Sequence, residues 1–452
     1  MQGALTSQSQ RVLVRLRAGV ETFRSSLFFL PAVCVAVAVG GAELMLAVDA
    51  RVPNDRLPGI VVTTVESARV VLGTIAAATI TVAGTVFSVT MVAFQLSASQ
   101  FSPRVLRGFL RDRFQQFVMG FVLGNFAYCL IVLRALRSGD ADSVPGLSIA
   151  FAVVLGVLAV VAILGYVDRA GRSMQVGEII RRITDETLLV IDATIPADPA
   201  PPAPPAPPLE AGAAVRACET GWVQQVSTDA VLDALAEGMS AHVLVRPGQF
   251  VARGEPLAVL CGAPAGAAIE HRVRSCFEIG RTRTMQQDVE FGVRQLVDIG
   301  LRALSPGIND PMTAYEVIVH LRPILLELLT RPLLGRVVAR DGCTVVRMSL
   351  PSHADYLEQS LGQLRHAGRD HLFVATALLD TLGRLVSELR QRELEDRIPL
   401  VCRQGQLVLE ECRSDHLIAA DITTLEHLAA EAGLMAPSAE TAVRDGEQEK
   451  IG

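Results

Sequence analysis

The chain has 452 residues, a net charge of −6 and a sequence pI of about 5.8. Half of its residues are hydrophobic, only 19% are charged, and the mean hydropathy is +0.38. The length allows two or three domains, and the acidic balance argues against a nucleic-acid partner. Because so apolar an average is unusual for a soluble enzyme, we expect membrane spans.

Four apolar runs lie before residue 170, and each is about 20 residues long, enough to cross a hydrocarbon core about 30 Å thick. The first run could instead be a secretory signal. It is longer than the roughly 7–15 apolar residues of such a signal, however, and three more runs follow it. After a basic N-terminal segment at 1–26, the sequence therefore predicts a four-helix transmembrane domain at 27–170, with spans near 27–48, 70–98, 114–133 and 144–167.

Arginines indicate the orientation of these spans. They cluster before the first span, between the second and third, and after the fourth, whereas the other two connections mix both signs of charge. By the positive-inside rule, both termini and everything after the fourth span are expected in the cytoplasm. The second connection, near 101–113, also repeats apolar residues at helical spacing. It is either a helix lying along the inner membrane surface or a positively charged loop.

The second half of the chain indicates a cytosolic α+β region. A connector with a proline-rich linker is expected at 171–209, a small β-rich, barrel-like unit at 210–265, an α+β domain at 266–435 and a flexible tail at 436–452. The β-rich part resembles biotinyl or lipoyl carriers, but it has no lysine for cofactor attachment. Within 266–435, Asp341-Gly342 predicts a hairpin turn in 337–350, and helices are expected at 284–304, 312–329, 354–367, 370–391 and 415–433.

Two segments carry a resemblance to a known family. They read TITVAGTVFSVTMVAFQLSASQFSPRVLRGFLRD at 79–112 and FGVRQLVDIGLRALSPGINDPMTA at 291–314, and the string Ser305–Pro311 is the most specific part. Together they resemble the bacterial "domain of unknown function 2254" family of predicted membrane proteins, over about residues 20–435. The resemblance implies four membrane spans and a soluble C-terminal half, but it implies no activity, substrate or catalytic residue.

The second span carries many small polar residues for so apolar a segment. On a helix with about 100° per residue, most of them fall within one arc of roughly 80°. Thr79, Thr90 and Ser97 lie outside that arc. The residues on it, which we treat as pore-lining candidates, are Thr74, Thr81, Thr85, Ser88, Gln95 and Ser99.

Three interpretations of this polar face remain open. The hydroxyls could bond back to carbonyls of their own helix while small residues allow close helix packing. The face could instead line a water-filled path formed by several copies, where hydroxyls and amides replace part of an ion's hydration. It could also hold a small polar ligand. Because one four-span subunit is too small to enclose a pore easily, the second interpretation requires a homo-oligomer.

In the C-terminal half, the string Ser305–Pro311 has a structural and a functional interpretation. Either Asn309 or Asp310 caps the next helix with Pro311 at its first position, or the two side chains bind a ligand or metal there. The preceding Glu290, Arg294, Asp298 and Arg302 have the spacing of i,i+4 ion pairs along one helix face.

No catalytic motif is found, and we expect no enzyme activity, no catalytic residue, no metal site and no cofactor. The eight cysteines are scattered and favour reduced, packing residues. We expect a multi-pass protein of the bacterial inner (plasma) membrane, in contact with the lipid bilayer and assembled as a homo-oligomer. The leading hypothesis is an ion channel or pore that passes inorganic ions along the second span, with a cytosolic regulatory domain. The alternative is a non-conducting, membrane-anchored sensor or scaffold.

Overall fold

A computed structural model describes residues 29–51, 64–100, 113–136, 144–173, 175–198, 204–209, 212–262, 266–413 and 417–435. The chain divides into an N-terminal unit, residues 1–175, and a C-terminal unit, residues 176–452. The basic N-terminal segment, the arginine-rich connection at 101–112 and the tail after 435 lie outside the described ranges.

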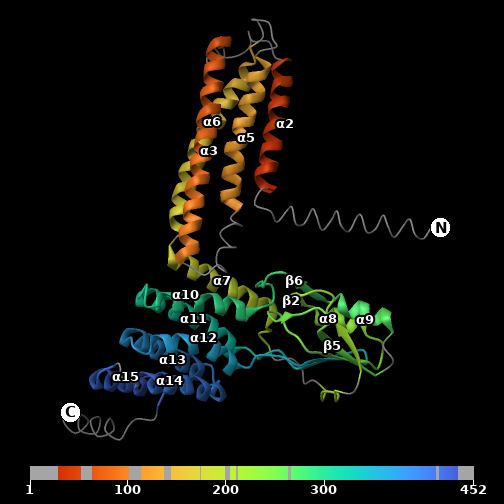
Figure 1. Cartoon of the computed structure of the whole chain (residues 1–452), viewed down its shortest axis with the longest axis vertical. Helices are drawn as coiled ribbons and strands as arrows, with labels where there is room; N and C mark the ends of the chain where they lie inside the picture. Colours follow the sequence, from red (N-terminus) through yellow and green to blue (C-terminus); the bar gives the residue numbers. More distant parts are fainter. Residues whose placement is uncertain are drawn as a thin grey trace. The chain divides into compact units, whose positions relative to one another are not determined.

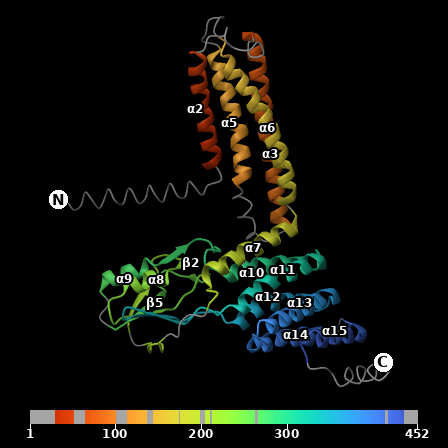
Figure 2. The same ribbon diagram turned by 180° about the vertical axis from the view of Figure 1, so that it is seen from behind.

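Four long helices run side by side in the N-terminal unit (Figures 1 and 2). By length and composition each could cross a membrane, which confirms the four predicted apolar helices. The second helix begins before its apolar run, and its first turn contains Glu66 and Ser67. The helices are α2 (Phe29–Asp49), α3 (Val65–Gln100), α5 (Arg113–Ala135) and α6 (Gly146–Ser173).

Helix α5 is the centre of this bundle and packs against α2, α3 and α6. Its closest approach is to α2. A Cβ atom added to Gly120 would lie 2.6 Å from Cα of Pro31, and one added to Gly124 would lie 3.1 Å from Cβ of Ala38. Glycines one turn apart allow two helix backbones to touch, which is a common way to pack helices in lipid. This Gly-x-x-x-Gly spacing is readable in the sequence, although it was not among the predictions.

The carboxylate of Asp49 joins the end of α2 to the start of α6. It accepts hydrogen bonds from the backbone N–H groups of Leu147 and Ser148, both at 2.9 Å. The first N–H groups of a helix have no partner within the helix, and the helix dipole favours an anion there. Asp49 therefore supplies from another helix the cap that the start of α6 needs.

The C-terminal unit contains a group of packed helices. Helix α10 contacts α11 and α12, α11 contacts α13, and α13 contacts α14 and α15 (Figure 1). Helix α7 lies against α10 and α11 and buries Ile180, Ile183 and Ile191 against them. The described helices are α7 (Val176–Thr194), α10 (Val289–Ala303), α11 (Pro311–Thr330), α12 (His353–Gly368), α13 (Leu372–Gln391), α14 (Ile398–Cys412) and α15 (Ala419–Glu431).

Five of these helices match predicted ranges, whereas α7 and α14 were not predicted. Their signals are present in the sequence. In α7, buried isoleucines recur three and four residues apart, and α14 begins with Ile398 followed by a proline, which is favoured in the first turn of a helix. Both helices pack against other helices of the C-terminal unit: α7 against α10 and α11, and α14 against α12 and α13.

The strands of this unit form two sheets that share one hydrophobic core. The five-stranded sheet has the order β1-β5-β3-β8-β7 and the three-stranded sheet the order β4-β2-β6. Val223, Leu257 and Phe277 all enter the same core, with helices α8 (Thr228–Ala234) and α9 (Ala267–Arg274) beside it. The strands are β1 (Ala213–Arg216), β2 (Gly221–Val226), β3 (Ser240–Val243), β4 (Phe250–Val251), β5 (Pro256–Cys261), β6 (Phe277–Gly280), β7 (Val337–Arg340) and β8 (Cys343–Arg347).

The predicted hairpin is present, and its position is informative. Asp341 and Gly342 have φ values of 53° and 75°, as a tight hairpin turn between β7 and β8 requires. Strand β8 then pairs in parallel with β3, so the hairpin completes the five-stranded sheet. The sequence predicted the hairpin but not its partner strand. A pairing between strands about 100 residues apart leaves no local pattern in the sequence.

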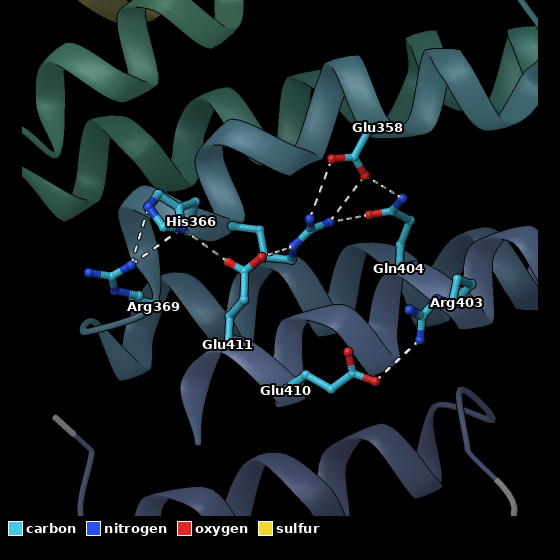
Figure 3. A network of polar contacts seen from close by, with 8 residues as sticks. Glu358, His366, Arg369, Arg403, Gln404, Glu410 and Glu411 are labelled. Atoms are coloured by element: carbon cyan, nitrogen blue, oxygen red, sulfur yellow. Dashed lines mark hydrogen bonds and ion pairs between the residues drawn. The ribbon is translucent and has the colours of Figure 1, made fainter. Parts of the chain in front are cut away.

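A buried arginine joins α12 to α14. The side chain of Arg365 is 8% exposed, and its guanidinium donates to Glu411 Oε1 at 2.8 Å and to Gln404 Oε1 at 2.6 Å. Glu358 accepts from the same guanidinium at 3.4 Å and from Gln404 Nε2 at 3.0 Å. Figure 3 shows Glu358, Gln404 and Glu411 converging on this one group. Burial opposes the charge, but these carboxylates raise the pKa of Arg365, so the cation is held between the two helices.

Candidate functional site

The polar face of α3 lies on the outside of the four-helix bundle. Thr74, Thr81, Thr85, Ser88 and Gln95 are all exposed, and none of them points into the contacts with α5 or α6. Ser67 extends the face by one more step, and Ser67, Thr74, Thr81, Ser88 and Gln95 follow one another at intervals of seven residues. The structure therefore brings the predicted residues together on one surface. The side chain of Ser99 lies outside the described residues.

Hydroxyls outside this face have the opposite environment. Thr79 is 6% exposed and donates to the carbonyl of Ile75 at 2.8 Å. Thr90 is partly buried and its hydroxyl contacts that of Tyr166 on α6. The helix thus sorts its polar residues: two threonines contribute to the packing of the bundle, and the face of the pore-lining candidates is not covered by other described residues.

Three hydroxyls on the exposed face bond to their own helix. Those of Thr74, Thr81 and Thr85 donate to the carbonyls of Val70, Ala77 and Thr81, at 2.7, 2.7 and 3.1 Å. Such bonds satisfy each hydroxyl's proton and leave its oxygen free to accept from water or from another chain. The interpretation in which hydroxyls bond back to their own helix therefore holds for these three threonines. Close helix packing, the other part of that interpretation, does not explain this face, because no described helix of the same chain covers it.

The face also has small neighbours. Ala77, Ala78 and Gly84 are exposed beside it, and a Cβ atom added to Gly84 would meet nothing within 4 Å. Larger apolar residues such as Phe87 and Val92 are exposed further around and along the helix. The middle of the face is thus shallow enough for another helix backbone, or a column of water, to come close.

The Ser305–Pro311 loop is built around the start of α11. Asp310 is the N-cap: its Oδ1 accepts from the N–H groups of Met312 and Thr313 at 3.1 Å, and its Oδ2 accepts from the Thr313 hydroxyl at 2.7 Å. Asn309 has a φ of 48° and donates its N–H to the carbonyl of Ser305 at 2.9 Å. The side-chain oxygens of Asp310 are thus engaged by its own helix, which is what the capping interpretation requires.

We expect Asp310→Ala to lower the free energy of unfolding by about 1–2 kcal/mol, the usual effect of removing an N-cap. The hydrogen bond from Thr313 is the main cause of a lowered pKa at Asp310. A carboxyl whose pKa is lower in the folded state stabilises at neutral pH, and this contribution disappears as the pH falls through the folded pKa. The difference in free energy of unfolding between wild type and Asp310→Ala, measured with urea, should therefore shrink below about pH 4.

Asn309→Gly is the matched control, because glycine adopts the positive φ of residue 309 without strain. Its free energy of unfolding should stay within about 0.5 kcal/mol of the wild-type value. An equal loss in both variants would contradict the assigned roles of the two side chains.

The predicted ion-pair series on α10 is only partly realised. Arg294 pairs with Asp298 at 2.9 Å, as the spacing suggests. Glu290, by contrast, is buried and binds Arg246 at 3.0 Å and the side-chain amide of Gln359. The first member of the series therefore joins α10 to the loop after β3 and to α12 instead of to its own next turn. Glu290 pairs with these distant residues because the first turn of α10 is buried. The local charge pattern does not show this burial.

Among the described residues, no three His, Cys, Asp or Glu side chains gather in a way that could hold a metal ion. All eight cysteines lie in the described ranges, and none of them forms a disulfide there. The polar residues that the sequence analysis missed, Arg246, Arg347 and Tyr356, line a cavity in the C-terminal unit. Arg246 lies about 100 residues before the other two in the chain, and no motif connects them.

Four apolar helices followed by a mixed helix-and-sheet unit define a multi-pass type of membrane protein. The chain belongs to the family described as "Predicted membrane protein (DUF2254)", whose model matches residues 24–384, which confirms the resemblance. It is 32% identical over 421 residues to uncharacterized proteins of Mycobacterium tuberculosis and Mycobacterium bovis, covering 87% of this chain and 79% of each relative. No solved structure matches the chain.

Proposed function

We propose that the protein is an ion channel or pore formed by several copies of the chain, with the polar face of α3 lining the path. The observation that carries this proposal is the exposure of Thr74, Thr81, Thr85, Ser88 and Gln95 on the outside of the bundle. In a single copy these polar groups would face lipid. Polar side chains within membrane helices normally face a protein interior or a water-filled cavity instead.

The spacing of the face supports an assembly around an axis. A seven-residue repeat follows the seam between helices that cross in a left-handed sense, as in coiled coils and many membrane bundles. Several copies of α3 arranged in this way would bring the same residues of each copy to the axis. Hydroxyl and amide oxygens there can replace part of an ion's hydration shell without a fixed charge. The passengers we propose are inorganic ions.

We place the assembly in the bacterial inner membrane with both termini and the C-terminal unit on the cytoplasmic side. The support for this orientation is the excess of arginine before α2, between α3 and α5, and after α6. In this arrangement the C-terminal unit regulates the path. The alternative is a non-conducting, membrane-anchored sensor or scaffold, in which α3 packs only against helices of neighbouring copies. Its support is the self-bonding of the threonine hydroxyls.

Ion flux into liposomes that contain the purified protein tests the proposal. Wild type should conduct, and Ser88→Leu should lose most of the flux, because a ring of leucines makes a hydrophobic constriction that excludes water. Val89→Leu is the matched control. It replaces an exposed residue next to Ser88 but off the polar face, and it should conduct like wild type. An intact oligomer that passes no ions at any voltage or pH would rule out conduction and leave the anchored sensor or scaffold.

A further inference from the structure

A cavity of about 340 Å³ lies in the C-terminal unit, where the sheets meet the helices. Its wall includes the end of α7, the ends of β2, β3 and β8, and the first turns of α10 and α12. About 300–1,000 Å³ is the usual volume of a site for a small molecule. Apolar side chains make up much of the lining, among them Val226, Val243, Val289, Leu334 and Leu350.

One wall of the cavity carries an arginine without a counter-ion. The guanidinium of Arg347 donates to the hydroxyl of Thr228 at 3.2 and 3.3 Å and to the carbonyl of Gly335 at 3.1 Å. Both acceptors are neutral, and no aspartate or glutamate of the described chain forms an ion pair with Arg347. Burial lowers the pKa of this guanidinium, with Asp229 opposing the shift from a distance. A cation in such a place is stabilised by an anion.

Two further donors around the cavity are incompletely used. Arg246 gives one end of its guanidinium to Glu290, but its Nε is buried and has no hydrogen-bond partner among the described residues. Tyr356 is 7% exposed, and no described residue accepts from its hydroxyl. Buried donors in folded proteins nearly always have a partner, so the missing partner of Arg246 Nε requires an explanation.

Two of the three acidic residues that line the cavity, in contrast, are already occupied, and the third, Asp229, is largely exposed and lies 3.6 Å from Arg340. Asp288 accepts from Arg283 at 2.6 Å and 3.0 Å and from the N–H of Phe291 at 3.0 Å. Glu290 accepts from Arg246 and Gln359. What the cavity offers a ligand is therefore hydrogen-bond donors and positive charge at one side and apolar surface at the other.

We propose that this cavity binds a small organic anion, a carboxylate or a phosphate ester, with Arg347 as its main anchor. The anionic head would accept from Arg347, Arg246 and the Tyr356 hydroxyl, and its apolar part would contact the valines and leucines of the lining. This site is independent of ion conduction, so it stands whether α3 lines a pore or only packs.

Isothermal titration of the full chain in a non-ionic detergent tests the site, with benzoate and phenyl phosphate as probes. At least one of them should bind with a Kd below about 1 mM. Inorganic phosphate shows whether the head group alone suffices. Benzylammonium and benzyl alcohol carry the same ring with the opposite charge or none, and they should bind at least about tenfold more weakly.

Arg347→Gln keeps a polar side chain but removes the charge, and it should weaken binding of the anion at least about tenfold. Tyr356→Phe removes only the hydroxyl and should weaken binding about three- to tenfold. Because that hydroxyl has no protein partner, the thermal stability of the ligand-free Tyr356→Phe variant should equal that of wild type, which a purely structural tyrosine would not show. Arg403→Gln, at an exposed pair with Glu410, is the control and should bind like wild type.

Three results would overturn the proposal. One is that neither organic anion binds with a Kd below about 1 mM. Another is equal binding of benzylammonium. The third is unchanged anion affinity in a folded Arg347→Gln variant, which would place any bound anion elsewhere. Should Arg347→Gln fail to fold, Tyr356→Phe decides the question.

Discussion

Replacing Arg365 with leucine is expected to lower the free energy of unfolding of the C-terminal unit by about 3 kcal/mol. The substitution leaves Gln404 buried and Glu411 three-quarters buried, without the cation that they face. Removing one member of a buried pair usually costs about 3–5 kcal/mol, and we take the lower end because Glu358 is 55% exposed and can turn to water. Urea unfolding of the purified chain, followed by circular dichroism, measures the change.

The matched control is Arg403→Leu on α14. Arg403 pairs with Glu410 at 3.2 Å, but both side chains are more than half exposed. Pairs of this kind contribute about 0–1 kcal/mol, so the control should unfold close to the wild-type midpoint. Similar losses in both variants would mean that the Arg365 network does not hold α12 to α14.

The second large effect is expected in the N-terminal unit, where Gly120→Ala should separate α2 from α5. The added methyl group would lie 2.6 Å from Cα of Pro31 and 2.9 Å from Cβ of Cys34, and backbone atoms cannot turn away. Forcing extra volume into a packed contact costs about 1–3 kcal/mol, and a clash with backbone belongs at the upper end. Resistance to unfolding in a mixed-micelle titration with sodium dodecyl sulfate reports the loss.

Gly40→Ala makes the same chemical change on α2, where a Cβ atom meets nothing within 4 Å. It should be neutral or should stabilise the helix by up to about 1 kcal/mol, since alanine is the better helix former. If Gly40→Ala and Gly120→Ala behaved alike, the close contact of α2 with α5 would not be a feature of the folded protein.

Periodic patterns made much of this fold predictable. The four apolar helices, the α10 and α11 pair, and the turn at Asp341-Gly342 each follow from spacing within a short stretch of chain. Likewise, the arc that contains Thr74, Thr81, Thr85, Ser88 and Gln95 follows from helix geometry alone. The capping of α11 by Asp310 is equally local, since a proline at the next position marks the start of a helix.

Features that depend on distant residues could not be predicted in this way. Which side of α3 faces the bundle is decided by its contacts with α5 and α6, so the direction of the polar face needed the structure. The parallel pairing of β3 with β8 and the ion pair between Glu290 and Arg246 also join residues that are distant in the sequence. So is the cavity, whose donors Arg246, Arg347 and Tyr356 meet only when sheet and helices pack together.

We propose that the exposed face of α3 surrounds a water-filled path in an assembly of several copies. A structure of the purified protein in a lipid bilayer tests it most directly. We expect a symmetric oligomer in which Thr81, Thr85 and Ser88 of every copy face a continuous central solvent column. A monomer whose α3 face lies against lipid, or an oligomer in which this face is closed against protein with no solvent path, would contradict it.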